Sequence, residues 1–456
     1  MIRDLVRKAY GSFIVLRNLP GQSRVPYLPL EKLHELRDRR VRETVRYAAQ
    51  TVPFYRDWFR EQGIDPADIR TADDLDRLPL ITKHLYREQP ERFRSTSKLG
   101  RNAMSLTSGG STGEPITVFR DHTSLLARGA YMQRQRAVMR KMLGGVRLPR
   151  ELILALPTGS TARSVKFRRE STFAYLRRRH RRVLWLGTPI DEVIAEINQF
   201  RPHSIGAYGS YVEALFRVVA QRGIDMHLPR MVAYGADTMS EDGMQLIREG
   251  FGVSVFSTYG SIEAPGIGFL CEECTGFHLN VDLVHLKLVD AEGRRLKPGE
   301  RGEVVVSNLT NRATVLLNYR LSDLGMLLQE RCPCGRTLPL ARIEGRVEDI
   351  LRLPDGGFLH PASVYNVFHE GRLRDGGQVL QFQVVQRAID DFEVRLAMAD
   401  RAAYDAVVAA YVADLQQVLG PSAKLEPVYY QGPVLAGPMG KVRRFVSLMQ
   451  DGEPVV

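Results

Sequence analysis

Disulfides, repeats and long apolar runs are what this chain lacks. It has 456 residues but only four cysteines and two tryptophans. Four cysteines in so long a chain cannot form the disulfide framework of a small secreted domain. No uninterrupted apolar run approaches the roughly 20 residues that a membrane-spanning helix requires, and no segment recurs at the spacing of a solenoid or a propeller. We therefore expect a cytoplasmic globular protein.

The amino-terminal stretch carries basic residues before a short apolar segment, as a signal peptide does. The apolar segment, residues 11–16, ends at Arg17 and is shorter than the roughly 7 to 15 apolar residues of a signal-peptide core. We interpret the stretch as an amphipathic first helix and leave open a peripheral contact with a membrane surface.

The composition is that of an ordinary globular protein, with 44% hydrophobic and 25% charged residues. The length is about three times that of a typical domain, so we expect one large domain with a smaller partner, or two comparable ones. Lys and Arg (64) exceed Asp and Glu (52), which leaves a net charge of +12. Residues 163–182 hold nine basic residues and one acid, hence +8 of this excess. Such a patch suits a nucleotide, an acidic carrier protein or anionic lipid, or it is a solvated helix face.

The order of predicted elements indicates an α/β fold. The first hundred residues have helical periodicity, and from Ser105 onward short β-rich runs alternate with helical segments, as in a largely parallel sheet. Closely spaced strands follow from about residue 265 to Gly345. The elements predicted for the rest of the chain have the order helix, strand, strand, helix, strand. We predict a large, multi-subdomain amino-terminal domain (1–345, with a β-rich subdomain at about 265–345) and a small α+β carboxy-terminal domain (346–456).

The segment 106–115, LTSGGSTGEP, is rich in glycine and hydroxyl residues. Its backbone N–H groups can approach phosphate oxygens closely. It is not a Walker A loop, because no Gly-Lys-Ser/Thr follows. Taken alone, such a turn is more often a structural hairpin than a phosphate loop.

Six segments in order resemble the adenylate-forming superfamily, and within it the phenylacetate–CoA ligase group and its CapK-like relatives. The segments are LTSGGSTGEP, VAYGADTMS, FSTYGSIEAPG, YRLSDLG, RIEGRVEDIL and PMGKVRRF. They are similar, respectively, to the family's phosphate loop, adenine-pocket strand, Tyr-Gly-x-x-Glu motif, ribose motif, hinge and terminal Gly-Lys motif. The resemblance covers nearly the whole chain and implies the adenylate-forming type of amino-terminal domain with a mobile cap.

The resemblance also implies roles for individual residues. The phosphates of ATP would be wrapped by Thr107, Ser108, Gly109, Gly110, Ser111, Thr112 and Gly113. The rest of the nucleotide would be bordered by Gly235, Ala236, Asp237, Tyr259, Gly260 and Ser261. Asp323 would accept the ribose hydroxyls and Arg346 would support the ribose or phosphate side.

Two further residues would act in catalysis according to the resemblance. Glu263 would help hold Mg²⁺, a hard cation that prefers oxygen ligands. Lys441 would bridge the substrate carboxylate and the α-phosphate, where negative charge gathers. Without the resemblance, Glu263 could be a helix cap, Asp323 a turn residue and Lys441 a surface residue.

Three departures from the family pattern are visible. Ile116 stands where many members have a lysine, and Leu321-Ser322 stand where Thr-Gly is usual. Residues 351–361, LRLPDGGFLHP, replace the Gly-Val-Asn-rich loop of the phenylacetate enzymes. The last departure leaves the acyl acceptor open between coenzyme A, an acyl-carrier protein and an amine.

The four cysteines fall into two close pairs, which is typical of a tetrahedral structural zinc site. The candidate ligands are Cys271, Cys274, His278, Cys332 and Cys334, of which four would bind; His278 enters through the resemblance. The sequence does not distinguish Cys274 from His278 as the fourth ligand. Such a metal would stabilise the β-rich subdomain; a redox-active Cys271–Cys274 pair, or four unrelated thiols, are the alternatives.

We therefore predict an acid–thiol ligase that uses ATP and Mg²⁺ to activate a small carboxylic acid and passes the acyl group to coenzyme A. Residues 152–161 and 205–211 would line the acyl pocket, and the cap would turn about Glu348-Asp349. A carrier protein or an amine is the alternative acceptor, in polysaccharide or secondary-metabolite biosynthesis. A basic, zinc-containing nucleic-acid-binding protein is the alternative of another class, but no RNA- or DNA-binding motif supports it. The oligomeric state is open, and a homodimer is plausible.

Overall fold

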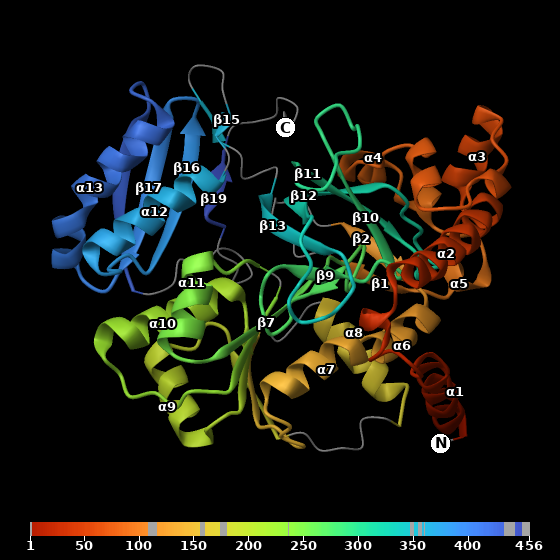
Figure 1. The fold of residues 1–456 in the computed structure, drawn as a ribbon, viewed down its shortest axis with the longest axis horizontal. Helices are drawn as coiled ribbons and strands as arrows, with labels where there is room; N and C mark the ends of the chain where they lie inside the picture. The colour runs from red at the N-terminus through yellow and green to blue at the C-terminus, as the bar shows by residue number, and fades with distance from the viewer. Residues whose placement is uncertain are drawn as a thin grey trace.

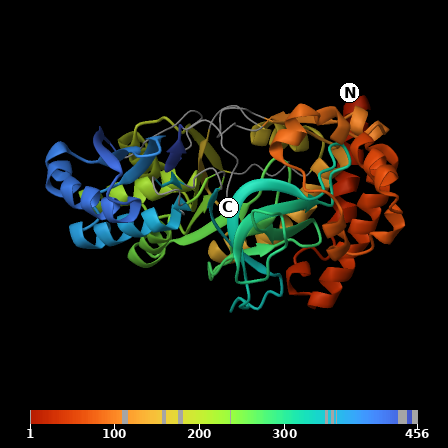
Figure 2. The ribbon, with the colours of Figure 1, turned by 90° about the horizontal axis from the view of Figure 1, so that it is seen from above.

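The computed structural model describes residues 2–107, 116–155, 160–173, 180–235, 237–346, 351–353, 358–359, 361–432 and 443–448. The chain forms a helical amino-terminal region, a central sheet and a carboxy-terminal body. Figures 1 and 2 show the amino-terminal helices and the carboxy-terminal body at opposite ends of the molecule.

The amino-terminal region is helical, as predicted. Its α-helices are α1 (Ile2–Asn18), α2 (Leu30–Thr51), α3 (Pro53–Gln62), α4 (Lys83–Glu88) and α5 (Lys98–Arg101). Short 3₁₀ helices lie between them at Val25–Tyr27, Pro66–Asp68, Asp73–Arg77 and Pro90–Phe93. Helix α2 buries Leu33, Val41, Val45 and Ala48 on one face, at helical spacing.

Helix α1 confirms the predicted amphipathic first helix but presents its apolar face outward. Its large apolar side chains are between 55% and 77% exposed: Ile2, Leu5, Val6, Tyr10, Phe13 and Leu16. Gly11 and Ile14 are buried instead, where α1 packs against α6 (His122–Tyr131). No helix in the described part of the chain is both long enough and apolar enough to span a bilayer.

The central sheet has eleven strands in the order β10-β11-β12-β13-β9-β8-β7-β6-β5-β3-β4. Its parallel half comprises β3 (Glu151–Ala155), β4 (Arg181–Trp185), β5 (Ser204–Ala207), β6 (Met231–Tyr234) and β7 (Ser254–Tyr259). The helices around this half are α7 (Gln133–Met142), α8 (Ser160–Glu170), α9 (Ile190–Phe200), α10 (Gly209–Arg222) and α11 (Glu241–Gln245), and a π-turn, η5, covers Leu246–Gly250. This alternation of strands and helices is the predicted α/β pattern.

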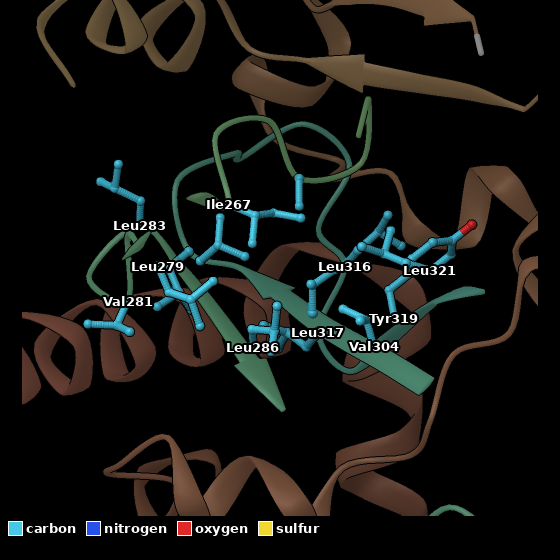
Figure 3. Packing of buried hydrophobic residues seen from close by; sticks show 14 of the residues in the cluster. Ile267, Leu279, Val281, Leu283, Leu286, Val304, Leu316, Leu317, Tyr319 and Leu321 are labelled. Carbon is cyan, nitrogen blue, oxygen red and sulfur yellow. The ribbon is translucent and has the colours of Figure 1, made fainter. Parts of the chain in front are cut away.

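The antiparallel half begins at β7, which pairs with β8. Its strands are β8 (Gly268–Phe269), β9 (Phe277–Leu279), β10 (Val284–Val289), β11 (Arg301–Asn308), β12 (Tyr319–Leu328) and β13 (Leu340–Arg346). A separate hairpin joins β1 (Met104–Thr107) to β2 (Thr117–Arg120). Figure 3 shows the apolar core beside this half, where Leu286, Val304, Leu317 and Tyr319 lie close together.

The carboxy-terminal body has its own sheet and core. Strands β16 (Gln381–Ala388), β17 (Asp391–Met398), β18 (Lys424–Gln431) and β19 (Phe445–Ser447) form the sheet, with helices α12 (Pro361–Asp375) and α13 (Arg401–Leu419); β14 (Leu351–Arg352) and β15 (Phe358–Leu359) precede them. The rings of Phe368 and Phe382 stack with centroids 3.6 Å apart. The body lies beside α10 and α11 in Figure 1.

A buried ion pair joins the helical region to the sheet. Arg134 on α7 donates to both carboxylate oxygens of Asp282, at 2.7 and 2.8 Å, and Arg40 on α2 donates to the same carboxylate at 3.0 Å. The Arg134 and Asp282 side chains are 1% and 3% exposed. Burial opposes ionisation of Asp282, but the two guanidinium groups outweigh it and hold the pKa below its ordinary value.

Replacing Arg134 by Met should lower the free energy of unfolding by about 3 kcal/mol, because a buried carboxylate loses its main partner. Urea denaturation at pH 7 measures this loss. The Arg294→Met control removes an exposed pair with Asp290 and should change stability by less than about 1 kcal/mol. Because the pKa of Asp282 is lowered in the folded state, the wild-type advantage should diminish as the pH falls below 3.8, the ordinary value. Equal losses in the two variants at pH 7 would contradict this role of the buried pair.

Candidate functional site

The candidate site lies at the carboxyl ends of β6 and β7, where ligands bind in open α/β sheets. Tyr259 ends β7, and its hydroxyl donates to Asp323 Oδ2 at 2.7 Å. Arg346 ends β13, and its Nε donates to Asp323 Oδ1 at 3.2 Å. The register of β12 and β13 places Asp323 opposite Arg346. Three of the predicted residues, from three strands, thus form one hydrogen-bonded group.

The hydrogen bond from Tyr259 to Asp323 persists at physiological pH. The pKa of Tyr259 is well above its ordinary value, first because the ring is buried and second because Asp323 is negative. Tyr259 therefore stays a hydrogen-bond donor at every physiological pH. Donors on both sides of the carboxylate hold it in one orientation.

Ser322 explains one departure from the family pattern. Its backbone φ is +60°, in the left-handed region that favours glycine. The resembled motif has glycine at this position, and here a serine takes the same conformation while its N–H donates to Glu303 Oε1 at 3.2 Å. The substitution therefore preserves the turn that presents Asp323.

Glu263 lies on the loop that follows β7. Asn308 donates to its backbone oxygen at 2.7 Å, and Tyr319 donates to its Oε1 at 3.5 Å. Gly260 allows the loop to fold back, because a Cβ there would lie 2.6 Å from the nitrogen of Gly266. Ser261 accepts a hydrogen bond from Ala264 N through its Oγ, at 3.1 Å. These contacts bring a carboxylate and a hydroxyl together on the Tyr259 loop.

Asp237 accepts hydrogen bonds that stabilise the amino end of helix α10. Its Oδ1 accepts the N–H of Gly209 at 2.5 Å, and its Oδ2 accepts the hydroxyl of Ser210. These contacts satisfy the amino end of α10, and burial raises the pKa of Asp237 despite them. Gly235 directly follows β6, two residues before Asp237. A Cβ at this position would lie 3.8 Å from Thr258 Oγ1.

Several predicted residues lie outside the described residues: Ser108, Gly109, Gly110, Ser111, Thr112, Gly113, Ala236, Glu348, Asp349 and Lys441. Thr107 ends β1, and its Oγ1 lies 3.2 Å from Thr117 Oγ1. The segments predicted to line the acyl pocket, 152–161 and 205–211, include the carboxyl ends of the adjacent parallel strands β3 and β5.

The candidate cysteine and histidine ligands form a second group. Cys271, His278, Cys332 and Cys334 bring their ligand atoms within 4.8 Å of one another. The Cys271 and Cys332 sulfurs are 3.5 Å apart, and Cys334 Sγ lies 3.3 Å from His278 Nε2. Burial lowers the pKa of His278 to about 4, so its imidazole is neutral, the form that binds metals. Three thiols and one neutral imidazole are a donor set that suits zinc.

Cys274 is not a member of this group. Its sulfur donates to the backbone oxygens of Val255 and Cys271, each at 3.4 Å. The described geometry therefore pairs Cys271 with Cys332 and not with Cys274.

The described cations of the basic segment 163–182 lie in different surroundings. Arg168 is buried, at 8% exposed. Arg181 pairs with Glu151 and Arg182 with Glu196, while Arg177, Arg178 and Arg179 lie outside the described residues. The described part of the segment thus keeps Arg163, Lys166 and Arg169 as its exposed cations.

The sequence did not predict the contact of Glu213 with Arg444, which joins helix α10 beside the central sheet to the carboxy-terminal body. Arg444 Nη2 donates to Glu213 Oε2 at 2.7 Å, and both side chains are buried. Glu213 Oε1 also accepts from Arg217 and from Ser240. The guanidinium of Arg444 lies over the Tyr365 ring, 5.3 Å from its centroid. The signal for this contact that the sequence does contain is a glutamate on a mainly apolar helix face.

Three comparisons bear on this arrangement. A model of the AMP-binding enzyme family matches residues 30–311. The phenylacetate-coenzyme A ligase of Thermus thermophilus is 29% identical over 390 residues, which cover 83% of this chain and 84% of that protein. The phenylacetate-coenzyme A ligase of Escherichia coli is 25% identical over 340 residues, 71% of this chain and 73% of that protein.

Solved structures share the fold. A crystal structure of 2-hydroxyisobutyryl-CoA ligase in the postadenylation state has a TM-score of 0.72 at 17% identity, covering 94% of this chain and 91% of that one. The same ligase in the thioesterification state, with 2-HIB-AMP and CoA, has a TM-score of 0.57 at 18% identity and the same coverage. These likenesses confirm the predicted α/β fold of the adenylate-forming type.

Replacing Arg444 by Met should loosen the contact between the bodies without unfolding either, because Glu213 keeps Arg217 and Ser240 as partners. Hydrogen–deuterium exchange should become at least about threefold faster in segments 208–213 and 379–384, since local opening follows lost contacts. The control is Arg374→Met, which removes an exposed pair with Asp414 inside the carboxy-terminal body. Unchanged exchange in Arg444→Met would show that the ion pair does not hold the bodies together.

Proposed function

Because this chain belongs to the AMP-binding enzyme family, we propose that it activates a carboxylic acid with ATP and transfers the acyl group to coenzyme A. In the first step a carboxylate oxygen attacks the α-phosphorus, the bond to the bridging oxygen of the β-phosphate breaks, and pyrophosphate leaves. In the second step the thiol sulfur attacks the acyl carbon, the thiol loses its proton, and AMP leaves. The family match gives no support to the alternative of a nucleic-acid-binding protein.

The observation that carries the proposal is the Tyr259–Asp323–Arg346 group at the strand ends. A carboxylate held by donors on two sides is a rigid acceptor, and the two neighbouring hydroxyls of a ribose are donors that fit it. Its place at the carboxyl ends of β6 and β7 is where nucleotides bind in sheets of this kind. We assign the ribose to Asp323, with Arg346 holding it and supplying positive charge.

The phosphates would lie between the 107–113 loop and Glu263. Glu263 presents carboxylate oxygens, the ligand type that Mg²⁺ prefers. Magnesium, when bound, neutralises phosphate charge and assists departure of pyrophosphate. Lys441 would bring a further positive charge to the α-phosphate, where the attack concentrates negative charge. In this scheme the carboxy-terminal body moves about Glu348-Asp349 between the two steps.

An acyl-carrier protein or an amine is a second candidate acceptor. The segment 351–361, LRLPDGGFLHP, favours it, because it differs from the loop of the coenzyme-A-using enzymes that the chain resembles. Incubation with the acid, ATP and then either coenzyme A or a carrier protein, followed by mass spectrometry of the acyl product, distinguishes the acceptors.

We also propose that Cys271, His278, Cys332 and Cys334 bind a structural zinc ion. The four ligand atoms lie within 4.8 Å of one another, and four protein ligands leave no open position for catalysis. The ion would join the β8–β9 region to the segment between β12 and β13.

Location in the cytoplasm, a homodimer and contact of α1 with a membrane surface stay predictions of the sequence.

Replacing Asp323 by Ala should lower kcat/KM for acid-dependent ATP–pyrophosphate exchange by at least about 100-fold, because charged hydrogen bonds to the nucleotide are lost. Lys441→Ala should cause a loss of at least the same size. The control Asp290→Ala changes an exposed carboxylate and should leave exchange unaltered. Exchange that survives both Asp323→Ala and Lys441→Ala would overturn the site assignment.

Purified protein should contain one zinc ion per chain by plasma mass spectrometry. Cys332→Ser should lose the ion and a few kcal/mol of stability, whereas Cys274→Ser should keep both, because Cys274 lies outside the cluster. Zinc-free wild-type protein that remains fully folded, or equal zinc loss in both variants, would refute the proposed ligand set.

A further inference from the structure

A small cavity lies behind the loop that carries Glu263. Its wall includes Arg120, Arg128, Tyr131, Gln135, Gly266 and Asn280. Arg120 donates to the backbone oxygen of Ile262 at 2.6 and 3.2 Å, so it is attached to the same loop. The cavity has a volume of about 30 Å³, room for one compact group and not for a nucleotide.

The wall of this cavity is positively charged. Arg120 is 4% exposed, and Arg168 on the neighbouring helix α8 is 8% exposed. Burial, and then the positive charges of Arg120 and Arg168, lower the pKa of Arg128 to about 9. Burial likewise lowers the pKa of Arg120 to about 10. Both values lie well above 7, so both groups are cations at neutral pH.

Among the described residues, none pairs with the charge of Arg128. Within the residues that the structure describes, its guanidinium makes no hydrogen bond or ion pair with an acceptor. Asp121 and Glu263 act electrostatically on Arg120, and Asp121 already accepts the backbone N–H groups of Ser124 and Arg312. An unpaired charge in such a place is costly unless an anion meets it.

Two other buried arginines of this protein show how such a charge is met when an acid is near. Arg134 has Asp282 and Arg444 has Glu213, each in a buried ion pair. Gly266 also keeps the cavity open for Arg128, because its φ is +76° and a Cβ there would lie 3.2 Å from Arg128 Nη1. Gln135, buried at 7% exposed, adds an amide to the wall.

We propose that this cavity binds a second anionic group of the substrate, so that the acid activated by this enzyme is a dianion such as a dicarboxylate. The inference rests on the proposed function, which places the phosphates at the Glu263 side of the same loop, and the reacting carboxylate must lie against the α-phosphate. Arg128 supplies the charge-assisted hydrogen bond, and Arg120 and Arg168 add positive potential around it. The volume favours a carboxylate over a larger phosphate ester.

The test compares acids that differ only in the distal carboxylate: glutarate with pentanoate, and 3-carboxyphenylacetate with phenylacetate. In ATP–pyrophosphate exchange, wild-type protein should prefer the dianion of at least one pair by about 10- to 100-fold in kcat/KM, the effect of one charged hydrogen bond. Arg128→Met should bring this ratio towards one, and Arg128→Lys should restore part of it. The control Arg140→Met, an exposed arginine on α7, should keep the ratio.

A thermal melt separates binding from a structural role. Arg128→Met removes an unpaired buried charge, so its melting temperature should equal or exceed that of the wild type without ligand. A melting temperature lowered by several degrees would make Arg128 a structural residue and overturn the proposal. A wild-type preference for neither member of the pairs, or a preference that Arg128→Met leaves intact, would overturn it as well.

Failure of the proposed function has a different signature. If no acid supports exchange, calorimetric titration of the nucleotide-free protein with glutarate and 3-carboxyphenylacetate tests the cavity alone. Binding that is at least about tenfold weaker in Arg128→Met, and unaltered in Arg140→Met, supports the anion site without the ligase. No binding of either dianion refutes the site.

Discussion

A charge removed from water must meet an opposite charge, and this constraint organises the protein. Three buried or half-buried pairs join segments far apart in the chain: Arg134–Asp282, Arg444–Glu213 and Arg346–Asp323. The first connects α7 to the segment before β10, where Arg40 of α2 meets the same carboxylate. The second connects α10 to the carboxy-terminal body, and the third builds the candidate nucleotide site. None of these pairs can form until the elements that carry it have assembled, so the fold and the site depend on the same contacts.

Strand β7 joins the two halves of the central sheet and carries a residue of the candidate site. It is parallel to β6 on one side and antiparallel to β8 on the other, so it belongs to both halves of the sheet. The parallel half leaves an open crevice at its strand ends, and the antiparallel half brings β12 and β13 back to that crevice. Tyr259 stands at this junction and reaches Asp323 across it. A wholly parallel or wholly antiparallel sheet would not place these residues together.

The loop after β7 has two faces with different charges. One carries the carboxylate of Glu263 beside Tyr319, and the other borders the cavity of Arg120 and Arg128. A substrate lying along this loop would meet a site for a cation and phosphates at one end and a site for an anion at the other. Under the proposal, an anionic group of the substrate would offset the charge of Arg128, which meets no acid among the described residues.

The sequence by itself determined the α/β class, the enzyme family and the segments that carry the candidate site residues, because these depend on periodicity and on short motifs that are contiguous in the chain. It also showed which cysteines are close in sequence, but not which of Cys274 and His278 joins the cluster. Only the tertiary structure decided that His278 does, that Asp237 holds α10, and that the basic segment is divided among separate partners. The Glu213–Arg444 contact and the unpaired Arg128 were equally invisible beforehand. The physical reason is that pairing and burial are properties of distances between residues remote in sequence, and no local pattern encodes those distances.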